Sequence, residues 1–283
     1  MTNELEAIRK IDELYDDLVA KGVTIPDAYK RRDPIEPGRE QKELAELKIE
    51  KLVKRLFKKQ EALIRAWMDV QFLGRKQVIS GPVNPPEDIL DDPEFIAIII
   101  ALVVLLAKQG IEITNVDAGD IIDTIAIQGV IIDWATTFTT EWMKTLNKTT
   151  LDALQKALEK FATTPGMTIQ DVIDLLPFDE TRAQMVAITE VTNLYGQAAQ
   201  LAGEQLARDN PGVRVIKTWW TNNDAIVRRC PVCWPLHGVS VKIKSKFVDG
   251  EGNKQIAPAA HPRGRCWISV RTDITKSVEL QKK

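Results

Sequence analysis

Hydrophobic positions recur at helical spacing through most of the first 210 residues of this 283-residue chain. In residues 3–21 apolar side chains recur every three or four positions, which predicts an amphipathic helix that stops at Gly22. Three prolines in residues 25–38 predict an extended linker. In residues 40–73 leucines recur among many Glu and Lys, which predicts a long helix with a charged outer face.

Residues 95–107 form the most apolar stretch of the chain. A helix needs roughly 20 apolar residues to cross a bilayer, so this stretch is too short by itself. We therefore expect a helix that is buried on all sides, and membrane insertion is the less favoured alternative.

Between residues 117 and 208 the apolar residues keep the spacing of a helix. Apolar spacing predicts helices over residues 117–147 and 150–161. Thr168, with Asp171 as its capping partner, predicts the start of a short helix. Asp179 is placed to cap a long helix that ends near residue 208.

After residue 210 the hydrophobic period changes from helix to strand. Strands are expected over residues 213–221, 239–247 and 266–272, and the second of them would present a row of lysines. Four of the seven tryptophans fall in this region and would enlarge a thin core: Trp219, Trp220, Trp234 and Trp267. The predicted fold is mainly α, with an elongated multi-helix body followed by a small C-terminal α+β module stapled by zinc.

These patterns divide the chain into four parts. Residues 1–38 are the N-terminal helix and linker, and residues 39–177 are the helical body. Residues 178–275 are a C-terminal domain that combines the long helix with the β-rich module, and residues 276–283 are a tail.

The net charge of −2 hides an asymmetry between the two ends of the chain. From residue 211 onward there are fourteen Lys and Arg against five Asp and Glu, so the C-terminal part is basic and the remainder is acidic. A basic module indicates a polyanionic or acidic partner, although the same charges could simply solvate its surface. The residues expected to make that contact are Lys242, Lys244, Lys246, Arg263 and Arg265.

All three cysteines lie in this basic module. Cys230 and Cys233 have the spacing at which a tight turn aims two thiolates at one metal, and His261 and Cys266 could complete the set. The hypothesis is a structural Zn²⁺ site with these four ligands. Buried, inert thiols and a redox pair are the alternatives.

The rest of the chain carries few signals of catalysis. Residues 1–210 contain no glycine-rich phosphate loop, no Ser/His/Asp constellation and no paired-His metal motif. An odd number of cysteines and a charged N-terminus argue against a secreted disulfide scaffold and favour a reducing cytoplasm. We therefore expect a protein that is not an enzyme.

Four motifs in the C-terminal third occur in a recognisable order. They are Arg182 followed by Ile188-Thr-Glu190, then Trp219-Trp220 and Asp224, then Cys230-Pro-Val-Cys233-Trp-Pro-Leu-His-Gly238, then Pro258-Ala-Ala-His-Pro262 and Arg265-Cys266. With these motifs, residues 178–272 resemble the C-terminal domain of the Mu F-like minor head proteins of tailed phages, also called phage head morphogenesis proteins.

The resemblance implies a low-copy structural protein of the portal vertex that acts in head morphogenesis and in DNA packaging or delivery. The implied partners are the portal protein and capsid or scaffold proteins, with the DNA phosphate backbone as a further candidate, whereas a membrane is not expected. The implied locations are the host cytoplasm during assembly and then the virion head.

Two positions depart from the family pattern. Gly264 stands where the family often has a further cysteine, which leaves one set of four ligands. His237 stands where the family often has Asp, so neither a catalytic nor a ligand role is assigned to it.

Structural roles are expected for several other residues of these motifs. Glu190 would form an ion pair with Arg182 or cap a helix, and Asp224 would form a turn that leads to the metal loop. The remaining residues given a structural role are Trp219, Trp220 and Gly238.

A rival hypothesis is a zinc-dependent nucleic-acid-binding protein or nuclease. In that case Asp224 or His237 would act as a base beside a three-ligand metal with one open position. A membrane-active delivery protein is a third possibility, and it depends only on residues 95–107.

Overall fold

The computed structural model describes residues 36–72, 85–86, 89–90, 92–119, 121–123, 126–221 and 230–273. The chain divides into two units, Met1–Glu36 and Pro37–Lys283, and every helix and strand given below belongs to the second. The predicted helix at residues 3–21, nearly all of the linker and the tail at residues 276–283 lie outside the described residues.

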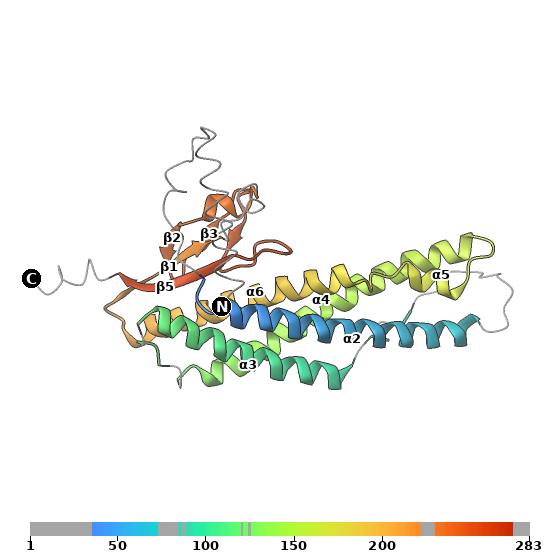
Figure 1. The fold of residues 1–283 in the computed structure, drawn as a ribbon, viewed down its shortest axis with the longest axis horizontal. Helices are drawn as coiled ribbons and strands as arrows, with labels where there is room; N and C mark the ends of the chain where they lie inside the picture. The colour runs from blue at the N-terminus through green and yellow to red at the C-terminus, as the bar shows by residue number, and fades with distance from the viewer. Residues whose placement is uncertain are drawn as a thin grey trace, which may run out of the picture. The chain divides into compact units, whose positions relative to one another are not determined.

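The described residues are mainly helical and end in a small strand-containing module, as the sequence predicts (Figure 1). Their α-helices are α2 (Arg39–Phe72), α3 (Pro93–Asp117), α4 (Gln128–Thr163), α5 (Ile169–Asp174) and α6 (Glu180–Asp209). Helix α6 packs against both α2 and α3, and α3 packs against α4. One hydrophobic cluster fills the space between these four helices, and a second surrounds α5 and the adjoining parts of α2 and α4.

The predicted helix starts are confirmed where a side chain caps them. Thr168 and Asp171 form a reciprocal capping box at the start of α5. The Asp179 carboxylate accepts a hydrogen bond of 2.9 Å from the Arg182 amide at the start of α6. These side chains satisfy amide donors that the first turn of a helix cannot pair internally.

Two predicted helix boundaries between residues 107 and 161 are wrong. Residue 117 ends α3 rather than starting a helix, because the chain turns at Gly119, whose φ of 89° is in the left-handed region. Residues 128–163 form one helix instead of two. The hydroxyls of Thr149 and Thr150 donate to carbonyls four residues earlier, so this pair continues the helix instead of interrupting it.

The prediction that residues 95–107 are buried on all sides is also wrong. Ile99 and Val103 are fully buried, but Ile98 and Leu105 keep 54% and 59% of their surface exposed. Helix α3 packs against α4 and α6 on one side, so within the described residues its opposite face is uncovered.

Among the described helices, only the one that contains Phe95–Asp117 is long and apolar enough to cross a membrane. This finding concerns length and composition alone, and a core helix of a soluble protein can pass the same test.

The C-terminal module contains a three-stranded antiparallel sheet. Its central strand β1 (Arg214–Trp220) pairs with β2 (Ser240–Lys242) on one side and with β5 (Trp267–Asp273) on the other. A separate hairpin joins β3 (Phe247–Val248) to β4 (Lys254–Gln255). Residues 213–221 and 266–272 were thus correctly predicted as strands.

The predicted single strand over residues 239–247 is broken into two short ones. The chain turns after Lys242, whose carbonyl accepts a 2.8 Å hydrogen bond from the Ser245 amide. Ile243 is buried against Gly203 of α6, and this contact holds the turn on the helix. All three lysines are exposed, but Lys242 ends β2 while Lys244 and Lys246 lie beyond it in the turn region, so they do not form one strand face.

Helix α6 supports the sheet through two close approaches at glycine. A Cβ atom on Gly203 would come within 2.5 Å of the Ile243 side chain, and one on Gly196 would come within 2.5 Å of the Pro258 carbonyl oxygen. Only glycine allows both contacts without displacement. The helix therefore fixes the position of the sheet and also that of the loop after Pro258.

Candidate metal centre

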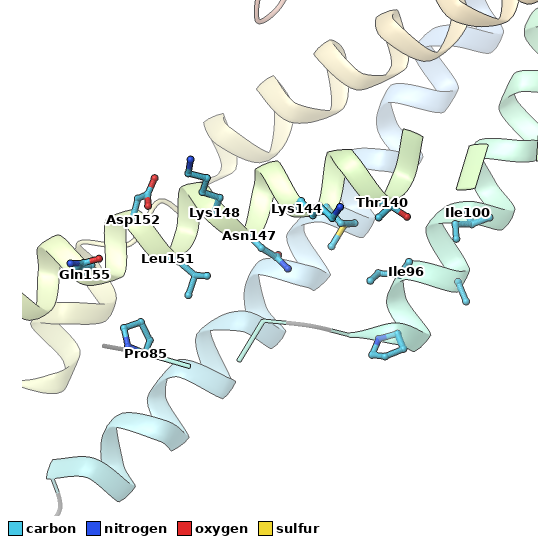
Figure 2. A pocket seen from close by; sticks show the side chains of 13 residues that line it. Pro85, Ile96, Ile100, Thr140, Lys144, Asn147, Lys148, Leu151, Asp152 and Gln155 are labelled. Carbon is cyan, nitrogen blue, oxygen red and sulfur yellow. The ribbon is translucent and has the colours of Figure 1, made fainter. Parts of the chain in front are cut away.

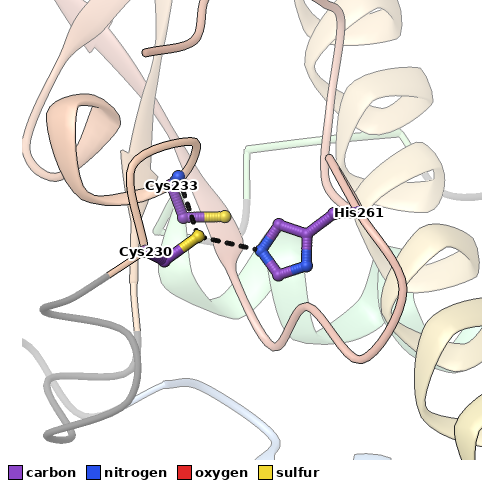
Figure 3. Close-up of side chains that lie close together, drawn as sticks. All are labelled: Cys230, Cys233 and His261. Carbon is purple, nitrogen blue, oxygen red and sulfur yellow. Dashed lines mark hydrogen bonds between the residues drawn. The ribbon is translucent and has the colours of Figure 1, made fainter. Parts of the chain in front are cut away.

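Cys230 and Cys233 lie on a tight turn that leads into a 3₁₀ helix, η3 (Trp234–Leu236). The Trp234 amide donates to the Cys230 carbonyl at 3.1 Å, and the Cys233 amide points at the Cys230 sulfur at 3.4 Å. Pro231 and Pro235 restrict the backbone on either side of the turn. The turn brings both sulfurs to the same side, toward the loop that carries His261 (Figure 3).

His261 reaches this pair from a different part of the chain. Its Nε2 lies 3.3 Å from the Cys230 sulfur, and the ligand atoms of Cys230, Cys233 and His261 all lie within 4.8 Å of one another. These three residues therefore form a group that could hold a metal ion (Figure 3).

The other ring nitrogen of His261 has its own partner. Nδ1 lies 2.8 Å from the Pro262 carbonyl oxygen, and since that oxygen only accepts, Nδ1 carries the hydrogen. In a neutral ring Nε2 is then unprotonated and faces the thiols. This is the tautomer that binds metals, held by the type of second contact that usually orients a histidine ligand.

The His261 loop is fixed to two helices of the bundle. The Arg263 amide donates to the Thr189 hydroxyl of α6 at 2.9 Å, and that hydroxyl donates to the Met185 carbonyl at 2.7 Å. The Arg265 guanidinium contacts the Glu46 carboxylate of α2 at 3.1 Å. The ligand set is therefore positioned by the helical body as well as by the module itself.

Cys266 is buried next to Cys233, immediately before β5. A hydrogen bond with the Cys266 thiol, followed by burial and by repulsion from the other two sulfurs, raises the pKa of Cys233 well above its ordinary value. Crowded thiols of this kind release their protons readily only when a cation compensates the thiolate charges. The fourth predicted ligand thus lies against the group of three, although it is not within the same 4.8 Å set.

Three of the residues predicted to have structural roles lie in the module: Trp219, Trp220 and Gly238. Trp219 is fully buried, with its ring 5.2 Å from that of Phe247 in the core of the module. Trp220 stacks on Trp267 at 5.9 Å and donates from its indole nitrogen to Ser269 at 2.8 Å. Gly238 has a φ of 75°, which glycine adopts without strain as the chain turns toward β2.

Glu190 is neither a cap nor beside Arg182. It lies in the middle of α6, where burial raises its pKa to about 7 and a hydrogen bond with Asn193 acts in the opposite direction. Arg182 instead donates to the carbonyls of Pro177 and Leu146 and covers the Phe57 ring at 4.8 Å. Asp224 lies outside the described residues.

His237 is held apart from the metal group. Its Nδ1 accepts a hydrogen bond of 3.2 Å from the Thr221 amide, and its ring stacks on Trp234 with centroids 5.3 Å apart. These contacts fit a structural role in the aromatic surroundings of the module.

Sequence reasoning missed a buried lysine on the central strand. The Lys217 ammonium donates to the Gln200 side chain at 2.8 Å and to the Ile256 carbonyl at 2.6 Å. Burial lowers its pKa to about 8, and Glu204 opposes that shift. The signal was present, because Lys217 shares the inward alternation of β1 with Val215 and Trp219.

A groove of about 960 Å³ lies between α3 and α4, and none of its lining residues is a cysteine (Figure 2). Its α3 side is apolar, and its α4 side includes Lys144, Lys148 and Asp152. Asn147 lines it and accepts a 2.9 Å hydrogen bond from Gln60. The hydroxyl on this lining, Thr140, donates to the Thr136 carbonyl rather than to a base, so the cysteine and histidine group is the better candidate site.

The fold and the site define a mainly helical protein with a small C-terminal module that presents a possible metal site. Comparisons with protein-family models, with curated proteins and with solved structures found no match to this chain.

Proposed function

We propose that this chain is a non-enzymatic minor head protein of a tailed phage, which acts at the portal vertex in head morphogenesis and DNA packaging or delivery. The proposal starts from the ordered motifs of residues 178–272. One observation carries it furthest: Cys230-x-x-Cys233 and His261 come from two separate motifs, yet their ligand atoms lie within 4.8 Å of one another. The portal, capsid or scaffold proteins would be its partners.

The metal in this proposal is a structural Zn²⁺. Cys230, Cys233 and His261 would bind it, and Cys266 would be the fourth ligand because its thiol already contacts Cys233. Thiolate and imidazole ligands suit zinc, and four protein ligands leave no position for a reactive water. When bound, the ion would join the Cys230 turn, the His261 loop and the start of β5.

The exposed lysines at positions 242, 244 and 246 would contact DNA phosphates or an acidic surface of the portal, together with Arg263. Arg265 contributes less in this proposal, because its guanidinium already pairs with Glu46. If DNA is the target, its affinity for the chain should fall steeply with salt and be indifferent to sequence.

The first experiment is quantitative mass spectrometry of purified DNA-filled particles from the phage or induced prophage that encodes the chain, together with immature procapsids. A low, fixed ratio to the portal protein in either particle supports the proposal. Absence from both particles would refute it.

The enzyme alternative is tested on the purified chain. A hydrolytic site needs an open coordination position, so metal binding should then survive loss of one of the four residues while nuclease activity disappears. Equal loss of metal in all four alanine variants, with no cleavage of DNA by the wild-type chain, supports the structural site.

A further inference from the structure

Helix α3 presents an apolar stripe to the outside of the helical body. The stripe comprises Ala97, Ile98, Ala101 and Leu105, all of which are exposed, with Ile98 at 54% and Leu105 at 59%. Positions 97, 101 and 105 are four apart and therefore follow one face of the helix. No charged residue occurs between Phe95 and Ala107.

The stripe differs from ordinary scattered surface hydrophobics because it is continuous. Only 33% of the most apolar window of this helix is buried within the described residues. Ala97 of the stripe lines the groove toward α4 together with its neighbours Ile96 and Ile100 (Figure 2), so the apolar surface extends beyond a single row. Contiguous apolar surfaces of this kind mark sites of association.

The order of side-chain sizes along the stripe makes it complementary to itself. If two α3 helices cross antiparallel with Ala101 at the twofold axis, position 97 of one copy lies opposite position 105 of the other. The exposed Leu105 side chain then fills the space above the small Ala97. Alanine at the crossing point allows the helix axes to approach closely, to roughly 8 Å.

From these observations we infer that α3 is the interface between two copies of this chain, paired antiparallel about Ala101. A twofold interface uses the same surface on both partners, and an uncharged stripe can face itself without like-charge repulsion. The inference does not depend on the proposed function or on metal binding.

The test is disulfide cross-linking of full-length chains under mild oxidation. The wild-type chain, oxidised in the same way, measures the cross-linking that its native cysteines give by themselves. Ala101→Cys should cross-link efficiently to a second copy of itself, because the two positions meet at the axis. Ala97→Cys is the matched control. In an antiparallel pair its two copies are separated by about 12 Å along the axis, too far for a disulfide.

A mixture of Ala97→Cys and Leu105→Cys chains should cross-link, although Ala97→Cys alone should not. Light scattering should show a wild-type dimer and a Leu105→Asp monomer with an unchanged circular dichroism spectrum, since Leu105 is not in the core. A wild-type monomer at high concentration would overturn the inference. So would equal cross-linking of Ala97→Cys and Ala101→Cys, or a monomer that binds phosphatidylcholine vesicles through the same stripe.

Discussion

At the scale of single residues, the candidate metal centre makes the sharpest prediction. Alanine at Cys230, Cys233 or His261 should weaken Zn²⁺ binding by more than the roughly 10–100-fold that loss of an outer contact costs, because each change removes a ligand atom. Metal content by mass spectrometry and the melting temperature of the module are the readouts. His237→Ala is the matched control, because this histidine bonds Thr221 and lies outside the ligand group.

Cys266 decides how many ligands the proposed Zn²⁺ would have. If Cys266→Ala lowers zinc content as much as Cys233→Ala does, four ligands close the site. Unchanged zinc content would contradict the four-ligand assignment and leave the group of three.

Lys217 predicts a pH dependence of stability. Its pKa is lowered to about 8 in the fold from an ordinary 10.5, so between these values the unfolded chain binds more protons than the folded one. The free energy of unfolding should therefore rise with pH across this window, by about 1–3 kcal/mol from this group. Denaturant titrations of the wild type and Lys217→Met should diverge as the pH increases from 8 to 10.5.

The exposed Lys254 provides the control for that experiment. Lys254→Met removes the same charge from the surface, so its stability should follow the wild type across the window. If Lys217→Met and the wild type have parallel pH profiles, burial is not shifting the titration of Lys217.

At the scale of elements, the contact of Gly196 with Pro258 should control the position of the His261 loop. Gly196→Ala would place a Cβ 2.5 Å from the Pro258 carbonyl, which must move and carry the His261 loop with it. A cost of about 1–3 kcal/mol is expected, as for other overpacked sites, together with weaker zinc binding. Thermal melts and zinc titrations measure the two effects.

Gly129→Ala is the matched control for that substitution. It lies in the first turn of α4 with nothing within 4 Å of the added Cβ, so alanine should be neutral or stabilising there. Equal effects of the two alanines would mean that α6 does not position the loop.

Elements with strong local signals could be predicted from the sequence, and elements fixed by distant contacts could not. Leucine periodicity and the Thr168 and Asp179 caps located α2, α5 and α6 well. The break after Lys242 depends on Ile243 meeting Gly203 of a helix about 40 residues earlier, and no local pattern encodes that contact.

In the candidate site, too, features with a local sequence signal could be predicted and features fixed by distant contacts could not. Spacing alone identified Cys230 and Cys233, because two cysteines three positions apart on one tight turn must lie close together in space. The anchoring of the His261 loop by Thr189 and Glu46 joins positions far apart in the chain, so it required the fold. The exposed face of α3 was missed because apolar composition does not reveal how many neighbours a helix has.

At the scale of the whole molecule, removal of the metal should affect the module more than the helices. Two hydrophobic clusters lie largely among α2 to α6, whereas the smaller cluster of the module contains Cys233 and Cys266 themselves. If the proposed Zn²⁺ is bound, its chelation should therefore change tryptophan fluorescence while most of the helical circular dichroism at 222 nm persists. Simultaneous loss of both signals would show instead that module and helices unfold together.

The position of α6 has a consequence for how the protein is made. Ribosomes release the N-terminal part first, at roughly 5–20 residues per second, so α3 emerges several seconds before α6, its partner in the bundle. During that interval the face of α3 that α6 will cover is open to solvent, in addition to the face that stays exposed in the fold. Expression trials truncated before residue 209 should therefore yield aggregates, and co-expressed chaperones should help the nascent full-length chain.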